Sequence, residues 1–172
     1  MTQKEYVSYD AMELAAAVHR GDVTATELLE LALQRLEALN PEINAVVHLM
    51  EEDARSAATT LTNGPFCGVP FLAKDLSSMS AGHPTSAGSR FMRNHMVTWD
   101  SELARRVKRS GVTVFGKTNT PEWGLQPVTE PELWGPTLNP WDVGRSSGGS
   151  SGGAGAAIAA GIVPMAGGGD GG

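Results

Sequence analysis

The sequence predicts an α/β fold with a partly parallel sheet. Helical patterns, in which apolar residues recur at spacings of three and four, alternate along the chain with short apolar runs rich in β-branched residues. Composition agrees with a folded protein, because 41% of the 172 residues are hydrophobic and 19% are charged, which is too apolar for a disordered chain. The chain has neither an internal repeat nor a linker that would divide it, so we expect a single domain.

Capping patterns place the first helices. Ser8 is predicted to cap a short helix that Gly21 ends. A Thr-x-x-Glu capping box at Thr24 opens a stronger helix over residues 25–39. Pro41 is predicted to stop this helix, because proline disfavours helical backbone in the residue before it. The apolar stripe of the stronger helix consists of Leu28, Leu29, Ala32, Leu33, Leu36 and Leu39.

The middle of the sequence alternates between strands and helices. Pro70 is acceptable only near the start of its strand, which then delivers Lys74 to the strand end. Asp100 is predicted to cap the helix that follows a long polar loop. The expected order is a strand over residues 44–50, a helix over 51–61, a strand over 69–74, a helix over 101–109 and a strand over 112–115.

Charge and cysteine usage exclude several classes of protein. A net charge of -6 argues against a nucleic-acid partner, since phosphate binding needs clustered Lys and Arg. The best apolar run, residues 154–166, is too short to span a membrane, so we expect no membrane partner either. Cys67 is the only cysteine, which excludes an intrachain disulfide and favours a cytoplasmic location. We expect this thiol to be buried.

Residues 111–118 match the phosphate-binding pattern G-x-x-x-x-G-K-[ST]. That pattern binds phosphate only where the residues between its glycines form a loop and a helix begins at the lysine. Here the intervening residues are typical of a strand, and Thr120 and Pro121 mark a turn and a new helix start instead. We therefore expect no nucleotide site.

Two further motif matches also fail. Residues 148–152 fit G-x-S-x-G, but the nucleophile elbow needs a preceding strand and a downstream histidine. Residues 139–147 are turn-like, and all four histidines lie upstream. Residues 167–172 fit the dinucleotide pattern G-x-G-x-x-G but show no helix after it. No histidine belongs to a metal-ligand cluster. We expect neither a metal nor a cofactor.

Glycine is concentrated near the end of the sequence. Of 21 glycines, 12 fall in residues 144–172, and glycines around a serine let a substrate approach the backbone closely. We reject a flexible linker for residues 145–153, because a helix of small residues suited to tight packing follows near residue 154. The run ends on Gly-Gly without a cap or docked helix, so we expect the sequence to continue.

Three motifs, in this order, resemble the amidase signature family of serine hydrolases: GVPFLAKD around Lys74, GKTNTPEWG from Gly116, and the glycine-rich run from Gly148 to Asp170. The resemblance extends over most of the chain. It implies an α/β amidase-signature fold, a mixed central sheet flanked by helices, with residues 1–172 as the N-terminal part of one domain. Within the family, residues 129–141 look most like the nylon-oligomer (aminohexanoate cyclic-dimer) hydrolases.

The resemblance also implies a catalytic triad of a nucleophilic Ser, a cis-Ser and a Lys. The Lys falls on Lys74 and the cis-Ser on Ser150. The nucleophile belongs to a pattern G-x-D-x-G-G-S and falls two residues beyond Gly172, so the sequence stops before it. Gly169 departs from the family, whose members often carry Thr before the Asp. The implied oxyanion-hole residues are Gly171 and Gly172, and the supporting residues are Ser151 and Asp170. For Ser151, a helix cap is the simpler role.

The implied activity is hydrolysis of carbon-nitrogen bonds in a small-molecule amide through an acyl-enzyme, on cyclic or linear amides or carbamates. Trp123 and Gln126 are candidates for the substrate pocket. Asp75 could tune the charge of Lys74, although an ordinary acid at a strand end is the simpler interpretation. Two other functions stay open: the glutaminase-like subunit of a tRNA-dependent amidotransferase, and a short non-catalytic binding protein. A homodimer is also possible.

Overall fold

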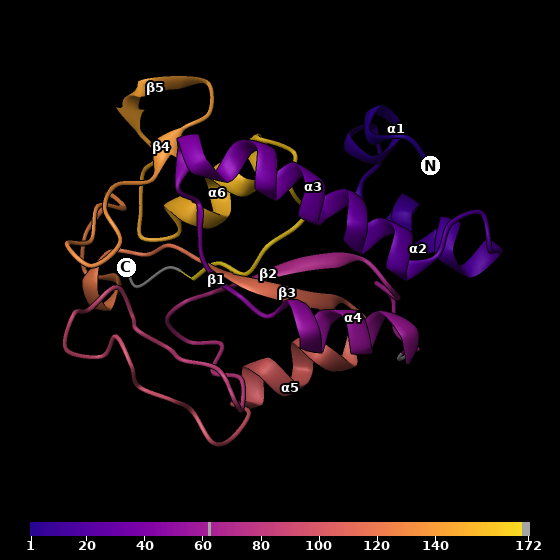
Figure 1. Ribbon diagram of the computed structural model, residues 1–172, viewed down its shortest axis with the longest axis horizontal. Coiled ribbons are helices and arrows are strands. Elements are labelled where there is room, and N and C mark those ends of the chain that lie inside the picture. The colour runs from indigo at the N-terminus through magenta and orange to yellow at the C-terminus, as the bar shows by residue number, and fades with distance from the viewer. Residues whose placement is uncertain (62, 170–172) are drawn as a thin grey trace.

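The computed structural model describes residues 1–61 and 63–169. Figure 1 shows helices above and below a small central sheet, with a separate hairpin at one end. No helix in the described part of the chain has the length and apolar character needed to cross a membrane. The elements are α1 (Gln3–Ser8), α2 (Ala11–Arg20), α3 (Ala25–Ile43), β1 (Val46–Leu49), α4 (Glu51–Thr59), β2 (Pro70–Lys74), α5 (Glu102–Arg109), β3 (Thr113–Thr118), a 3-10 turn η1 (Glu122–Gly124), β4 (Leu138–Asn139), β5 (Asp142–Ser146) and α6 (Gly152–Ala159).

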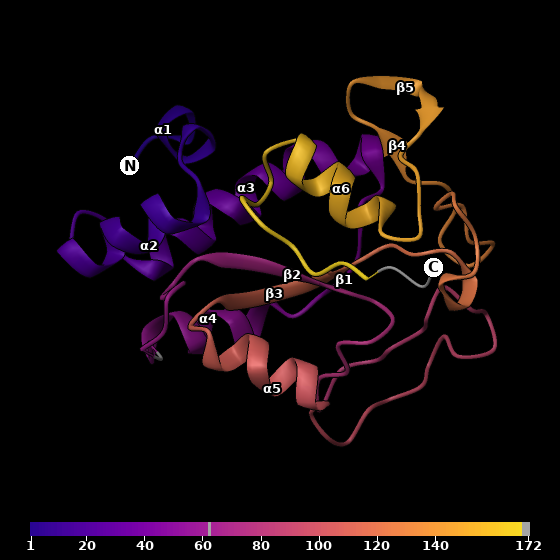
Figure 2. The same ribbon diagram turned by 180° about the vertical axis from the view of Figure 1, so that it is seen from behind.

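The central sheet is mixed, as the sequence resemblance predicts. Its strand order is β1-β3-β2, with β2 parallel to β3 and β1 antiparallel to β3. Helices α3 and α6 cover one face, and α4 and α5 lie on the other (Figures 1 and 2). The segment after α6 returns to the sheet, where Ala166 pairs in parallel with Leu72 of β2. The second sheet is the hairpin of β4 and β5.

Alternation along β2 assigns its side chains to the two faces. Leu72 belongs to the main hydrophobic core with α3 and α6, whereas Phe71 and Ala73 form a smaller cluster with Val112 on the other face. Because side chains alternate along a strand, Lys74 shares the α6 face with Leu72. Pro70 stands at the first position of the strand, which confirms the expected place of this proline. Cys67 is buried with a free thiol, as expected.

Both early helix boundaries differ from the prediction. Asp10, not Ser8, caps α2 through a capping box with Glu13, and the Ser8 hydroxyl donates to the carbonyl of Glu5 in α1. Helix α3 continues through Pro41 to Ile43. The Asn40 side chain bonds the backbone of residues 45 and 46 and so holds the last helical turn against the start of β1. Asn44, the C-cap residue, bonds the carbonyls of Trp134 and Pro136, so a distant segment also holds this helix end.

Three later predictions are also adjusted. Ser101 rather than Asp100 caps α5, since its hydroxyl accepts from the amide of Ala104. The strand expected over residues 112–115 begins at Thr113 and runs on to Thr118, so residues 113–118 of the G-x-x-x-x-G-K-[ST] match lie in β3 and not in a phosphate-binding loop. The turn-like residues 139–147 form most of the β4–β5 hairpin, which is exposed along β5.

Candidate active site

The end of β2 carries Lys74 to the glycine-rich loop before α6. The Lys74 side chain is buried, and its Nζ donates hydrogen bonds to Ser150 Oγ at 2.7 Å and to Ser151 Oγ at 3.0 Å. The structure therefore brings together three of the predicted site residues that are 76 and 77 positions apart in the sequence.

The peptide bond between Gly149 and Ser150 is cis, the geometry implied by the sequence resemblance for Ser150. Gly149 leaves no room for a side chain, because a Cβ there would lie 2.8 Å from the amide nitrogen of Val128 and 2.9 Å from the Gln126 carbonyl oxygen. The backbone of residues 126–128 thus packs directly on the cis peptide.

Two threonines that the sequence analysis did not select hold this loop. Thr120 donates its hydroxyl to the Ser150 carbonyl at 3.1 Å, so it does not cap the short turn η1, whose N-cap residue is Pro121. The Thr129 hydroxyl donates to the Gly148 carbonyl at 2.9 Å and accepts from the Gly152 amide at 3.0 Å. Thr120 lies two residues after the end of β3, in the motif GKTNTPEWG that also contains Lys117. Its place in this motif is the sequence signal that could have identified it.

Ser151 occupies the N-cap position of α6 but makes no side-chain capping bond, so the helix-cap interpretation is wrong. Its hydroxyl instead accepts from Lys74 Nζ and from the Gly169 amide, and donates to the Gly169 carbonyl, both Gly169 bonds being 3.1 Å long. Ser151 therefore joins Lys74 to the run of glycines that begins at Gly167, which we call the second glycine-rich segment. The predicted residues Asp170, Gly171 and Gly172 lie outside the described residues.

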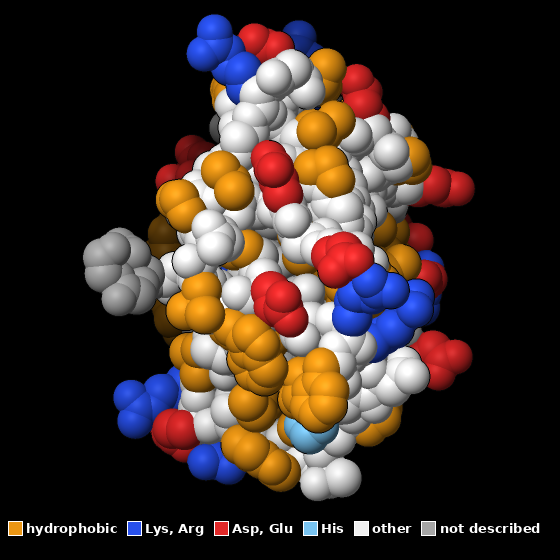
Figure 3. Space-filling model, turned by 90° about the vertical axis from the view of Figure 1, so that its left-hand side faces the viewer, with side chains coloured by type: hydrophobic (Ala, Val, Ile, Leu, Met, Phe, Trp, Pro, Cys, Tyr) orange, Lys and Arg blue, Asp and Glu red, His pale blue; other side chains and the backbone are white. Residues whose placement is uncertain are grey.

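The two predicted pocket residues line one cavity. Trp123 and Gln126 border a space of about 330 Å³ together with Leu125. Ser150 is not among the residues that line this cavity; the two are linked through Gly124, which lies between Trp123 and Leu125 in the sequence and where a Cβ would lie 3.7 Å from Ser150 Oγ. Trp123 is 47% exposed and Leu125 77% exposed. Apolar side chains gather on the face made by the 80–100 loop and the 120–140 segment (Figure 3).

Two buried ionisable residues, Lys117 and Asp75, lie on the opposite face of the sheet from Lys74. Lys117 is fully buried, and its Nζ donates to the Pro84 carbonyl at 2.5 Å and to Thr85 Oγ1 at 2.7 Å. Burial lowers the pKa of Lys117, against the attraction of Asp75. Burial likewise raises the pKa of Asp75, whose carboxylate accepts from Ser86. Asp75 is thus a buried hydrogen-bond acceptor at the strand end.

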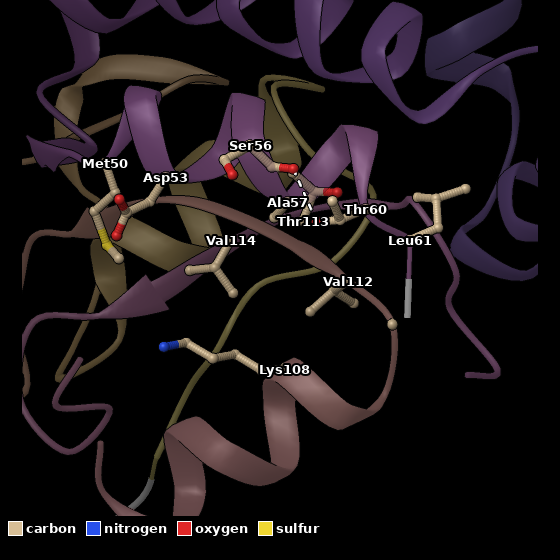
Figure 4. Close-up of a pocket in the computed structure, with 11 residues that line it drawn as sticks. Met50, Asp53, Ser56, Ala57, Thr60, Leu61, Lys108, Val112, Thr113 and Val114 are labelled. Atoms are coloured by element: carbon tan, nitrogen blue, oxygen red, sulfur yellow. Dashed lines mark hydrogen bonds between the residues drawn. The ribbon is translucent and has the colours of Figure 1, made fainter. Parts of the chain in front are cut away.

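A second cavity, of about 350 Å³, lies away from these residues between α4, α5 and β3 (Figure 4). Its floor is apolar, with Val112 and Val114 of the β3 region, and Asp53 and Lys108 approach it from α4 and α5. None of the predicted site residues that the structure describes lines this space. We therefore centre the candidate site on Lys74 and Ser150.

The amidase signature motifs imply an α/β fold in which a strand ends at a buried lysine next to a serine that follows a cis peptide bond. This structure has that arrangement at Lys74 and Ser150. A family model described as Amidase matches residues 27–172. The chain belongs to this family.

Curated relatives place the chain among enzymes named for amide substrates. It is 46% identical, over 94% of its length, to 6-aminohexanoate-cyclic-dimer hydrolase of Paenarthrobacter ureafaciens. It is 41% identical, over 99% of its length, to an acylamidase of Rhodococcus erythropolis. One subunit of the glutamyl-tRNA(Gln) amidotransferase of Corynebacterium glutamicum is 34% identical over 96% of the chain. The matches cover 33%, 37% and 35% of those proteins, so the chain spans about a third of their length.

Solved structures agree with the sequence comparison. The structure of 6-aminohexanoate cyclic dimer hydrolase complexed with substrate matches with a TM-score of 0.89 and 44% identity, over 93% of this chain and 33% of that one. The resemblance to the aminohexanoate cyclic-dimer hydrolases and the amidase-signature fold are therefore both confirmed.

Proposed function

We propose that this protein is an amidase that hydrolyses carbon-nitrogen bonds through an acyl-enzyme on a Ser-cisSer-Lys triad. The observation that carries the proposal is the 2.7 Å hydrogen bond between buried Lys74 and Ser150, at a cis peptide. We further propose that residues 1–172 form the N-terminal part of one domain, and that the nucleophilic serine follows two residues after Gly172.

In the proposed reaction Lys74 is the base, a role for which burial suits a lysine because it favours the neutral amine. Lys74 takes the proton of the Ser150 hydroxyl while Ser150 takes the proton of the nucleophilic serine, which attacks the amide carbonyl. Ser150 then returns a proton to the leaving amine. Water hydrolyses the acyl-enzyme, so that amide and water give acid and amine.

The second glycine-rich segment would stabilise the developing charge. Backbone amides at Gly171 and Gly172, with those of the residues that follow, would donate to the oxyanion of the tetrahedral intermediate, each worth about 3 kcal/mol of barrier. Support comes from Ser151, whose bonds to Lys74 and Gly169 tie the base to this segment. Asp170 is proposed to anchor the turn.

The substrate class we propose is a small amide whose apolar part lies against Trp123 and Leu125. Support comes from Trp123 and Leu125 in the cavity wall, which also carries Glu122, Glu130 and Glu132, and from the relatives named for a cyclic dimer and for acyl amides. Gln126 supplies a polar group at the cavity wall.

The test uses the full-length protein and the 6-aminohexanoate cyclic dimer as substrate, with a fluorophosphonate probe for the nucleophile. Lys74→Ala and Ser150→Ala should each lower kcat/KM about 10³-fold or more, and Lys74→Ala should abolish probe labelling. Lys108→Ala, at an exposed lysine of α5, is the matched control and should keep wild-type activity. Wild-type turnover or labelling by Lys74→Ala would contradict the proposed triad.

A glutaminase-like subunit of an amidotransferase is the second candidate, favoured by the 34% identical relative. It requires release of ammonia from glutamine and co-purifying partner proteins. A protein that hydrolyses the cyclic dimer, purifies without partners and leaves glutamine intact excludes this candidate. A non-catalytic binding protein requires that no Gly-Ser pair follows Gly172, which the extended sequence decides.

A further inference from the structure

Asp75, the residue after Lys74, holds a turn of the long loop between β2 and α5. Its carboxylate is buried and accepts the Ser86 hydroxyl at 2.5 Å and the Ser86 amide at 3.1 Å. A carboxylate that accepts both groups of one residue fixes the position of that residue more firmly than a single neutral bond would. The loop is thereby attached directly to the strand end that carries Lys74.

Ser86 in turn connects several segments. Its hydroxyl accepts from the Trp134 indole at 3.0 Å and from the Gly88 amide at 3.2 Å. Gly88 packs against the backbone of residues 120 and 121, because a Cβ on Gly88 would lie 2.5 Å from the Thr120 carbonyl oxygen. All the hydrogen-bonding capacity of the Ser86 hydroxyl is therefore used within the protein.

Ala87, which lies between Ser86 and Gly88, connects this turn to the wall of the cavity. The Ala87 carbonyl accepts the Trp123 amide at 2.8 Å, and both residues have positive φ, 51° and 56°. Non-glycine residues rarely adopt such a backbone, and they do so where surrounding contacts hold them. The 86–88 turn thus holds the backbone of Trp123 in position.

Trp123 and Gly124 lie between this turn and the cis-serine. Trp123 lines the cavity, and a Cβ on Gly124 would lie 2.8 Å from Leu76 Cδ2 and 3.7 Å from Ser150 Oγ. A shift of the 86–88 turn would therefore move the cavity wall relative to Ser150.

We propose that Asp75 and Ser86 are positioning residues that set the position of Trp123 in the cavity wall relative to Ser150, and so select the size of the amide substituent bound there. Neither residue takes part in proton transfer. This inference rests on the proposed amidase function. It adds a determinant of substrate size that lies on the opposite face of the sheet from Lys74.

The experiment measures kcat and KM of the full-length protein on two substrate series. One is 4-nitroanilides with acyl chains from acetyl to decanoyl, and the other is acetamides with N-alkyl groups of the same lengths, so that either side of the amide is tested. In Ser86→Ala and Asp75→Asn, the ratio of kcat/KM between the longest and shortest members of one series should change on the order of tenfold. Most of that change should appear in KM for the long members.

Thr113→Val is the matched control, because it removes a buried hydroxyl at the start of β3. It should leave the ratio of kcat/KM between long and short substrates unchanged. Asp75→Asn keeps the shape of the side chain and decides the question if Ser86→Ala does not fold. An unchanged ratio in folded, active variants, or an equal fall for every substrate, overturns the positioning role alone. Failure of the wild-type protein to hydrolyse any amide overturns the proposed function and this inference together.

Discussion

Gly153 lies where α6 packs against the backbone that flanks β1 and β3. A Cβ there would lie 2.5 Å from the Asn119 amide nitrogen and 2.6 Å from the Ala45 carbonyl oxygen, both backbone atoms that cannot turn aside. Those two atoms are themselves hydrogen-bonded to each other at 2.8 Å. Gly155, two residues along the same helix, is exposed and has nothing within 4 Å of a Cβ.

The two glycines should therefore respond oppositely to the same substitution. Gly153→Ala forces α6 away from the β1 and β3 ends and should lower the free energy of unfolding by about 1–3 kcal/mol. Gly155→Ala adds a helix-favouring methyl in open space and should raise it by about 0.5–1 kcal/mol. Urea denaturation of both variants measures the difference. Equal values would show that α6 does not pack on the sheet as described.

At the residue scale, sequence reasoning found Lys74 and Ser150 because each stands in a distinctive motif. It did not find Thr129 or the buried Lys117. Thr129 acts through hydrogen bonds to a loop 19 and 23 residues further along the chain. Lys117 looked like part of a phosphate-binding motif, although its Nζ is bonded to the 84–85 loop. The local sequence carries no sign of these partners.

Among the elements, α2 shows how a boundary is decided between two competing caps. Asp10 accepts the Glu13 amide at 2.8 Å, and the Glu13 carboxylate accepts the Asp10 amide at 2.8 Å. Ser8 is the last residue of α1, where its hydroxyl bonds Glu5 at 2.8 Å. Helix α1 was not predicted, and for that reason Ser8 was expected to begin a helix although it ends one.

Asp10→Ala should lower the free energy of unfolding by about 1 kcal/mol, because it leaves amides of the first turn of α2 without a side-chain acceptor. Ser8→Ala should change it by less than about 0.5 kcal/mol, as surface substitutions outside a cap usually do. Thermal and urea unfolding of the two variants test the assignment. A larger loss for Ser8→Ala would restore Ser8 as the cap.

For the whole molecule, a short chain of titratable side chains joins β1, the 80–100 loop and α4. His83 Nε2 donates to the Asp53 carboxylate at 2.8 Å. In neutral His83 the Nδ1 atom is then an acceptor, and His48 Nε2 donates to it at 3.2 Å. Burial, His83 and Lys117 together lower the pKa of His48 to about 4. Neutral His48 is therefore the form that the folded protein favours.

This linkage predicts a pH dependence of stability. An unfolded histidine binds its proton near pH 6.5, whereas folded His48 binds it near pH 4, so the unfolded state holds more protons between these values. The free energy of unfolding should fall as pH drops from about 6.5 to 4. His48→Gln should reduce that fall by about 1 kcal/mol, an amount discounted because the ring is only half-buried.

The matched control for this prediction is His95→Gln, at an exposed histidine of the 80–100 loop that also contains His83. It should leave the pH dependence between 6.5 and 4 as in the wild type. Urea unfolding at several pH values measures all three proteins. Identical profiles for wild type and His48→Gln would contradict the assignment of this pH dependence to His48.

Local patterns in the sequence predict the α/β class, the strand that ends at Lys74 and the strand character of the G-x-x-x-x-G-K-[ST] match, and they contain the motifs of the amidase family. These depend on local periodicity, proline position and short motifs, which neighbouring residues encode. Three features could be seen only in the folded protein: Asn44, the C-cap of α3, bonds the carbonyls of Trp134 and Pro136, Ser151 bonds Lys74 instead of capping α6, and Asp75 holds Ser86. Each of these is a hydrogen bond between segments brought together by folding, and the energy of such a bond depends on the position of a partner that no local pattern specifies.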